Sequence, residues 1–277
     1  MQEQTLKKIS LNHRTYAHAD SAPNPAALPV VLLHGLMGYA SNWGKIWPAL
    51  QKERDVLVYD QRGHGRSDKP AHGYSPADYA SDAIGLLDEL GWARVHIIGQ
   101  SMGGRVAMRL AQDYPERIAA LVLEDSGAES RTNRLDWIRG MLARVPVPFA
   151  DRDSAKAFFV REFAADPMLA GFLHANIERR DDGKFAWRFL PAAMVETIAA
   201  GRALDATEMF RALRAPTLLV RGGRSEEFSQ GEAERMRDLR AGVELAVIAE
   251  AGHFVHPAFP EEFSEIAARF LALHDPA

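Results

Sequence analysis

Gly99-Gln100-Ser101-Met102-Gly103 is the stretch of sequence that decides the fold. It directly follows the apolar run Val95-His96-Ile97-Ile98, which is typical of a buried strand, and it precedes a helical pattern over residues 105–112. A G-x-S-x-G sequence between a strand and a helix predicts a nucleophile elbow, a sharp turn that raises a serine hydroxyl above the end of a parallel sheet. The turn needs a strained serine backbone, and small residues on both sides let the chain pass itself. We therefore predict Ser101 as a nucleophile.

A second glycine-containing loop lies upstream of the elbow. The apolar run at residues 29–33 leads into His34-Gly35-Leu36-Met37-Gly38. Attack of a serine on an acyl carbonyl produces an oxyanion, which backbone N–H groups stabilise. We expect the amides of Leu36 and Met102 to form this oxyanion hole.

A serine hydroxyl is a poor nucleophile at neutral pH and needs a base within hydrogen-bond reach. We predict His253 as this base, because it lies in a loop after the strand-like run at 243–248 and its Gly252-His253 pair matches the pair that the family resemblance given below implies for the base. His256 is a competitor, but no glycine precedes it and a proline follows it. We expect His34 and His64, which lie in glycine-containing loops, to hold those loops rather than to carry protons.

Four segments together resemble the α/β-hydrolase superfamily. They are the loop at 34–38, Asp60-Gln61-Arg62-Gly63-His64-Gly65-Arg66-Ser67, the elbow at 99–103, and the Gly252-His253 pair. The resemblance implies an α/β fold in which a mostly parallel sheet is flanked by helices. It also implies that residues 1–127 and 207–277 form the core and that residues 128–206 form an inserted helical cap, here called the cap segment.

The carboxylate that orients the base departs from the commonest pattern of this superfamily. Most members carry it as G-x-x-D after the strand that is here residues 217–220, but this chain has Gly222-Gly223-Arg224-Ser225. A serine cannot hold the imidazole tautomer or stabilise imidazolium as a carboxylate does. Part of the family uses a carboxylate at the end of the strand after the elbow instead. The G-G-x-S sequence and an aspartate at the earlier strand resemble small bacterial and mitochondrial carboxylesterases.

We predict Asp125 as the acid, because it follows Ser101 by one helix and one strand and can emerge beside the elbow. Alternation along a strand points Glu124 and Asp125 to opposite faces, so only one of them can serve. Glu226 in the later loop is the alternative acid, and Glu227 is a further one. The alternative interpretation of Asp125 as a turn former is compatible with catalysis.

Alternating strand and helix patterns predict a parallel sheet that is covered on both faces. Residues 7–11 and 14–17 are expected to form an opening hairpin. Further strands are expected at residues 30–33, 55–59, 95–98, 118–124, 217–220 and 243–248. Helices are expected at residues 43–52, 76–90, 103–113, 231–239 and 260–273.

The cap segment shows no strand alternation and is rich in helix formers and large apolar residues. Its prolines at positions 146, 148, 167 and 191 divide it into several short helices. We expect it to cover the carboxyl ends of the strands, where open α/β sheets bind ligands. Most of its aromatic residues should pack within the cap, and a few should line an apolar pocket. Its 12 Lys or Arg residues balance 11 Asp or Glu residues, so we expect no general advantage for anionic substrates.

The composition limits the classes of partner and site. The net charge of −4 has no long single-sign block, which argues against nucleic-acid binding. The absence of cysteine excludes a thiol nucleophile and a disulfide framework. The first residues lack a signal core, and no apolar run approaches the ~18 residues of a spanning helix, so we expect a cytoplasmic protein that binds no membrane. We expect no cofactor and no metal. The sequence does not indicate the oligomeric state of the protein.

The predicted reaction is transfer of an acyl group to water. A serine at the elbow disfavours the epoxide hydrolases and haloalkane dehalogenases of this superfamily, which need an aspartate there. We predict a carboxylesterase for small to medium acyl chains, with thioesters or lactones as further substrates, that works through an acyl-enzyme. The alternatives are a C–C bond hydrolase of ring-cleavage products and a non-catalytic ligand receptor on the same fold. The presence of Ser101, His253 and a carboxylate argues against the receptor.

Overall fold

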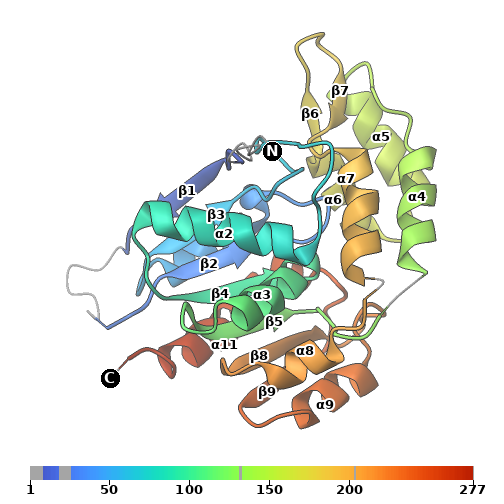
Figure 1. The fold of residues 1–277 in the computed structure, drawn as a ribbon. Helices are drawn as coiled ribbons and strands as arrows, with labels where there is room; N and C mark the ends of the chain where they lie inside the picture. Colours follow the sequence, from blue (N-terminus) through green and yellow to red (C-terminus); the bar gives the residue numbers. More distant parts are fainter. Residues whose placement is uncertain (1–8, 19–25, 131–132, 203, 277) are drawn as a thin grey trace, which may run out of the picture.

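A seven-stranded sheet forms the centre of the molecule (Figure 1). The computed structural model describes residues 9–18, 26–130, 133–202 and 204–276. The sheet has the strand order β1 (His13–Tyr16), β3 (Val56–Tyr59), β2 (Val30–Leu33), β4 (Val95–Gln100), β5 (Ile118–Glu124), β8 (Thr217–Gly222) and β9 (Val243–Ile248). β1 is antiparallel to β3, and all other neighbouring strands of this sheet are parallel. The predicted mostly parallel sheet is therefore confirmed.

The predicted opening hairpin is wrong. Residues 9–12 form no strand, and residues 7 and 8 lie outside the described residues. β1 pairs instead with β3, so that Arg14 lies opposite Val58. Asn12 is tied to the end of β3, because its side-chain nitrogen donates to Asp60 and its carbonyl accepts from the Asp60 amide. Short polar strands carry too little pattern to indicate which strand they pair with.

Side chains of the central strands alternate between two apolar cores. Val31 and Leu33 of β2 face one core, and Val30 and Leu32 face the other. The first core also contains side chains of α2 (Pro76–Leu90), α3 (Met102–Asp113), α8 (Thr207–Ala212) and α9 (Gln230–Asp238). The second contains side chains of η1 (Ala40–Lys45), α1 (Trp47–Leu50), α10 (Val255–Ala258) and α11 (Pro260–Ala272). Helices on both faces explain why the strands read as nearly continuous apolar runs.

One helix of this core differs from its prediction. The expected helix at residues 43–52 is split into the 3₁₀ helix η1 and the short helix α1. Pro48 lies in the first turn of α1, where its missing N–H and fixed φ are tolerated. A proline inside a continuous helix would instead have removed a hydrogen bond, so the chain starts a new helix there.

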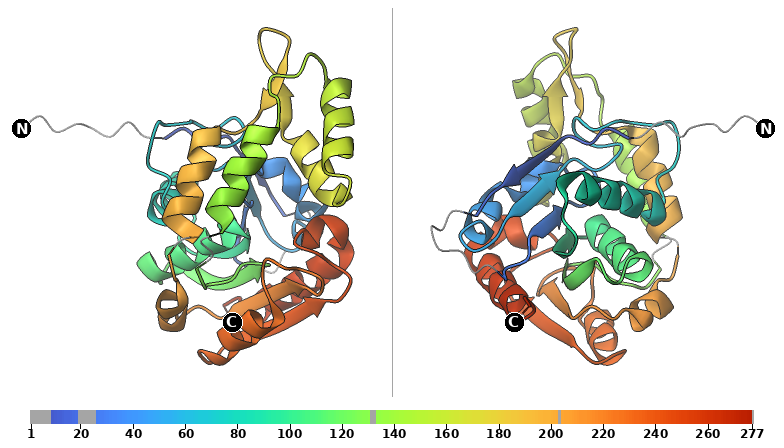
Figure 2. Two further views of the ribbon diagram at one scale, coloured as in Figure 1. Left: turned by 90° about the vertical axis from the view of Figure 1, so that its right-hand side faces the viewer. Right: turned by 60° about the vertical axis from the view of Figure 1, so that its left-hand side comes forward.

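The described part of the cap segment lies beyond one end of the sheet (Figures 1 and 2). Ala206 N–H donates to the Ala128 carbonyl over 2.8 Å, so the two ends of the segment meet. Pro167 and Pro191 begin two of its helices, as prolines in a first turn do. The helices are α4 (Arg134–Arg144), α5 (Arg152–Glu162), α6 (Pro167–Ala175), α7 (Pro191–Thr197) and the π-helical turn η2 (Ile198–Arg202).

The cap segment also contains strands, which the sequence had not predicted. β6 (Ile177–Arg179) and β7 (Phe185–Trp187) form an antiparallel hairpin. Strands of three residues are too short to show the alternation by which strands are recognised. The available signal was Asp182-Gly183 in the turn, where Gly183 has a φ of 83° that favours glycine.

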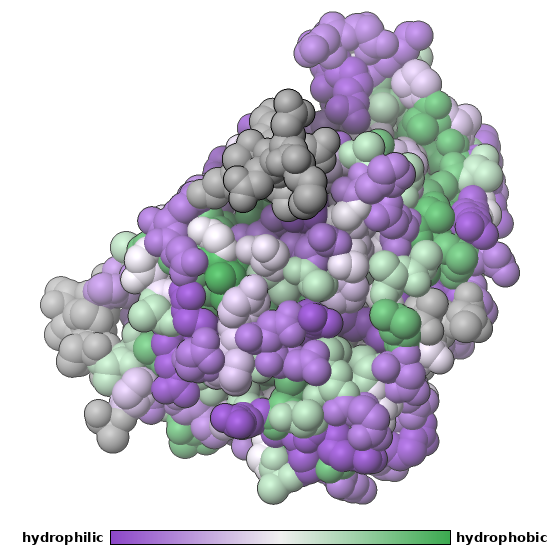
Figure 3. All heavy atoms as spheres, viewed as in Figure 1, coloured by the Kyte–Doolittle hydropathy of each residue, from purple (hydrophilic) through white to green (hydrophobic). Residues whose placement is uncertain are grey.

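The surface is mainly polar on the face that Figure 3 shows, and apolar residues gather over the cap helices. Trp137 of α4 and Val160 of α5 are 40% and 59% exposed. Trp137 also lines the pocket that contains Ser101. Among the described residues, no helix combines the length and apolarity that crossing a membrane requires.

Candidate active site

Ser101 lies at a strained turn between β4 and α3. Its φ of 52° and ψ of −110° put it in the left-handed φ region, which costs free energy for a residue with a side chain. A Cβ atom on Gly99 would lie 2.4 Å from the Gly103 carbonyl oxygen, and one on Gly103 would lie 2.2 Å from the Leu33 carbonyl oxygen. Only glycine fits at these two positions, which explains the G-x-S-x-G spacing.

Two hydrogen bonds join this turn to the end of β5. Ser101 N–H donates to the Glu124 carbonyl over 2.9 Å. The Ser126 hydroxyl donates to the Ser101 carbonyl over 2.7 Å. The residues on both sides of Asp125 therefore hold the backbone of Ser101, and this sets the position of Asp125 relative to the elbow.

Asp125 is completely buried and accepts three hydrogen bonds. Its Oδ2 atom accepts from His253 Nδ1 over 2.7 Å and from the Ser225 hydroxyl over 2.5 Å. Its Oδ1 atom accepts from the Gly222 amide over 3.1 Å. The backbone φ of 44° turns Asp125 out of the strand path toward these donors. A buried carboxylate with this many donors is held in one orientation.

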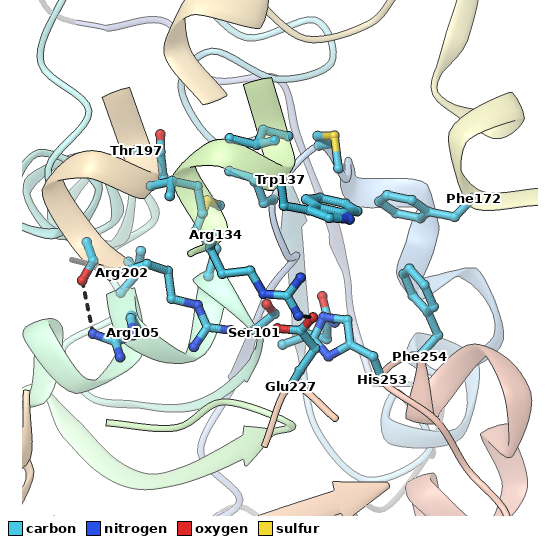
Figure 4. Close-up of a pocket in the computed structure, with 18 of the residues that line it drawn as sticks. Ser101, Arg105, Arg134, Trp137, Phe172, Thr197, Arg202, Glu227, His253 and Phe254 are labelled. Carbon is cyan, nitrogen blue, oxygen red and sulfur yellow. Dashed lines mark hydrogen bonds and ion pairs between the residues drawn. The ribbon is translucent and has the colours of Figure 1, made fainter. Parts of the chain in front are cut away.

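His253 lies in the loop after β9 and lines the same pocket as Ser101 (Figure 4). Because Asp125 accepts from Nδ1, the ring proton is on Nδ1 and the lone pair is on Nε2. Gln100 Nε2 lies 3.3 Å from His253 Nε2, so Nε2 faces the elbow. This tautomer is the one that a base acting on a serine needs.

The neighbouring residue Glu124 pairs with the other histidine of the same loop. Its carboxylate accepts from His256 Nδ1 over 2.7 Å and from the His256 amide over 2.9 Å. The His256 ring stacks on Trp43 with 4.1 Å between centroids, and both residues are buried. Glu124 and Asp125 thus serve two different histidines, and His256 is held away from the pocket that contains Ser101.

The alternative acids Glu226 and Glu227 both line the pocket. Glu227 forms ion pairs with Arg134 of α4 and with Arg202 of η2, the latter over 3.7 Å. Of the four carboxylates considered from the sequence, the structure places Asp125 against Nδ1 of His253.

The loop before Met37 is held by two buried neutral histidines. His34 Nε2 accepts from the Gln61 amide over 3.0 Å, and His64 Nε2 accepts from the Met37 amide over 3.2 Å. The Nδ1 atoms of His34 and His64 lie 2.8 Å from the carbonyls of Gly35 and Arg62, respectively, to which they donate. Burial lowers the pKa of both histidines. A second proton on either ring would have to bind at Nε2, where it would collide with the backbone N–H that donates to this atom.

Leu36 and Met102, whose amides the sequence predicts as an oxyanion hole, both line the pocket. Met102 is the first residue of α3, where backbone N–H groups lack partners within the helix and the helix dipole favours negative charge. The histidine-held loop carries Leu36 to the same pocket.

The pocket has a volume of about 280 Å³ and two unlike ends on either side of Ser101 (Figure 4). Trp137 and Phe172 of the cap segment and Phe254 of the core form an apolar end. Arg202 and Thr197 lie at the opposite, polar end. Within the described ranges, no group of three or more His, Asp or Glu side chains is arranged to hold a metal ion.

Sequence reasoning missed three features of the site. The sequence pattern identifies Ser225 only as the residue that replaces the usual acid, whereas in the structure its hydroxyl donates to Asp125. The G-G-x-S sequence was the available signal. The position of Gln100 against His253 and the ion pairs of Glu227 carried no sequence signal, because their partners come from distant segments.

Known proteins resemble this chain in sequence and in fold. The profile of the alpha/beta hydrolase fold family matches residues 29–260. A protein of Bacillus subtilis (strain 168) that bears the provisional name 2-succinyl-6-hydroxy-2,4-cyclohexadiene-1-carboxylate synthase is 31% identical over 265 residues, covering 92% of this chain and 94% of the relative. An sn-1-specific diacylglycerol lipase of Mus musculus is 30% identical over 264 residues, covering 89% and 82%. The crystal structure of an E-2-(acetamidomethylene)succinate hydrolase has a TM-score of 0.83 at 26% identity and covers 96% of each chain.

The buried histidines predict a loss of stability in acid. Because burial lowers the pKa of His64 well below 6.5, the unfolded chain binds a proton at a higher pH than the folded protein does. The free energy of unfolding should therefore fall as the pH drops below about 6.5. His64→Gln, which keeps an acceptor for the Met37 amide, should be less stable at about pH 7.5 but lose less stability toward about pH 5. Urea unfolding at several pH values measures both effects.

His72→Gln provides the control, because the His72 side chain is 90% exposed. This variant should follow the pH dependence of the wild type. Parallel curves for the wild type and His64→Gln would contradict the role assigned to the neutral His64 ring.

Proposed function

This chain belongs to the alpha/beta hydrolase fold family, and we propose that it is a serine hydrolase that cleaves carboxylic esters. The observation that carries the proposal is the Asp125–His253 hydrogen bond, whose histidine faces the elbow of Ser101 in one pocket. In the proposed triad Ser101 is the nucleophile, His253 is the base and Asp125 is the acid. Ser101 and His253 in one pocket, with Asp125 buried behind His253, favour an enzyme over a ligand receptor.

The proposed reaction has two halves. His253 Nε2 removes the proton of the Ser101 hydroxyl while the oxygen attacks the ester carbonyl. The amides of Leu36 and Met102 stabilise the oxyanion, and the protonated His253 then gives its proton to the leaving alcohol. In the second half, water attacks the acyl-enzyme with His253 again as base, which releases the acid and restores Ser101. Asp125 stabilises the imidazolium that forms in both halves.

Substrate size is argued from the pocket. A volume of about 280 Å³ is at the small end of ligand sites, and Trp137, Phe172 and Phe254 offer apolar contact at one end. These features support esters of small to medium acyl chains, with thioesters and lactones as further substrates. The mouse relative is named for an ester substrate, whereas the other two proteins compared are named for different reactions. Family membership therefore does not choose the substrate, and the pocket carries this part of the proposal.

The nucleophile is tested by covalent labelling. A fluorophosphonate reacts with an activated serine, so we expect one adduct on the peptide that contains Ser101. Ser101→Ala should abolish both the adduct and the hydrolysis of p-nitrophenyl esters. Ser81→Ala, which changes an exposed serine of α2, is the matched control and should label like the wild type. An unlabelled wild-type protein, or full esterase activity in Ser101→Ala, would refute the proposal.

The acid is tested by two amide substitutions. Asp125→Asn should lower kcat by up to ~10⁴, as the equivalent change does in a known triad, because an amide favours the wrong imidazole tautomer. Glu226→Gln removes the alternative carboxylate at the pocket wall and should have a small effect. Steady-state kinetics with p-nitrophenyl butyrate measures both variants. The reverse ranking would move the acid to the loop after β8.

The apolar end of the pocket is tested with a series of acyl chains. Each methylene added to the acyl chain should lower the activation free energy that kcat/KM reports by up to ~0.8 kcal/mol, until the chain fills the pocket. We expect the optimum at short to medium p-nitrophenyl esters. A flat response, combined with turnover of a dienoate ketone above that of all simple esters, would favour the C–C bond hydrolase instead.

A further inference from the structure

We propose that Glu227 sets the charge selectivity of this pocket by occupying the place between Arg134 and Arg202 that a substrate carboxylate would take. The inference rests on the proposed function, because it concerns which esters reach Ser101. It implies that the wild-type protein prefers uncharged esters and that the loop after β8, which carries Glu227, contributes to substrate specificity.

The ion pairs of Glu227 join the core to two separate parts of the cap segment. Arg134 is the first residue of α4 and Arg202 is the last of η2, whereas Glu227 belongs to the core. One oxygen of Glu227 pairs with Arg134, and the other lies 3.7 Å from Arg202 Nη2. The side chains of Arg134, Glu227 and Arg202 are 22%, 19% and 7% exposed. The three residues line the same pocket as Ser101 and His253 (Figure 4).

The position of Arg202 is supported from the core. Arg105, in the first turns of α3, donates to the carbonyls of Gly201 and Leu204 over 3.0 and 2.9 Å. These hydrogen bonds hold the backbone on both sides of Arg202. The backbone of Arg202 therefore does not depend on Glu227, and we expect the arginine to remain at the pocket wall when Glu227 is changed.

Two guanidinium groups around one carboxylate form a binding site for an anion. Guanidinium donors match the two oxygens of a carboxylate, and the attraction is strong where the groups are partly withdrawn from water. Glu227 already fills this arrangement from within the chain. A substrate carboxylate would have to displace it and would meet like-charge repulsion at short range. The polar end of the wild-type pocket consequently accepts uncharged substrate groups in preference to carboxylates.

The experiment compares two esters that differ in charge at one end. Mono-p-nitrophenyl glutarate carries a carboxylate where p-nitrophenyl pentanoate carries a methyl group. We expect the wild type to prefer the pentanoate, and we expect Glu227→Gln to raise the ratio of kcat/KM for the glutarate over that for the pentanoate by about tenfold or more. Arg134→Gln should lower the ratio, and Glu227→Gln combined with Arg134→Gln should lose most of the gain.

Glu53→Gln is the matched control, because it removes one negative charge at an exposed position after α1, outside the pocket. Its ratio should equal that of the wild type. An unchanged ratio in Glu227→Gln, an equal rise in Glu53→Gln, or a wild type that already prefers the glutarate ester would overturn the proposal.

A binding measurement separates this proposal from the failure of ester hydrolysis. In the Ser101→Ala background, calorimetry compares monomethyl glutarate with methyl pentanoate as non-reacting probes. Adding Glu227→Gln should tighten binding of the monomethyl glutarate about tenfold relative to methyl pentanoate. An unchanged relative affinity would overturn the selectivity role even if no ester is hydrolysed, whereas a gain in affinity without hydrolysis would support it and refute only the proposed reaction.

Discussion

The hydrogen bond from His253 to Asp125 depends on the way the end of β5 is tied to the elbow. Ser101 is bonded through its own amide and carbonyl to Glu124 and Ser126, so the residue between them cannot move independently of Ser101. Ser225 and Gly222 then complete the hydrogen bonds of the Asp125 carboxylate from the next strand. Three neighbouring strands, β4, β5 and β8, therefore determine where the imidazole of His253 lies.

Adjacent carboxylates bind two histidines of one loop, and this pairing fixes the loop at two points. Asp125 holds His253 at the pocket, and Glu124 holds His256 against Trp43 in the core. The buried His256 pair anchors the chain that follows His253, so that the exposed edge of the imidazole faces the pocket with little freedom. Elsewhere at the pocket, the neutral rings of His34 and His64 hold the loop that carries Leu36. Buried hydrogen bonds to histidines therefore hold both the loop that carries the proposed base and the loop that carries Leu36.

Features with local causes were predictable from the sequence. The elbow could be recognised because Gly99 is required by contacts within the turn, and the parallel sheet because its strands are buried on both faces. Asp125 could be preferred because a serine stands where the usual acid would be. The β6–β7 hairpin, the partner of β1 and the Arg134–Glu227–Arg202 contacts depend on segments that meet only after folding. Their residue patterns are too short or too polar to indicate a partner.

The central claim is that the acyl group of the substrate becomes covalently bound to Ser101 during the reaction. Trapping this acyl-enzyme intermediate tests the claim most directly. Wild-type protein would be mixed with p-nitrophenyl acetate, quenched in acid during turnover, digested and analysed by mass spectrometry. The account predicts an acetyl group on the peptide that contains Ser101, and its absence from the same peptide of Ser101→Ala. Release of p-nitrophenol at the wild-type rate without an acetylated Ser101 peptide, or with the acetyl group on another residue, would contradict the account.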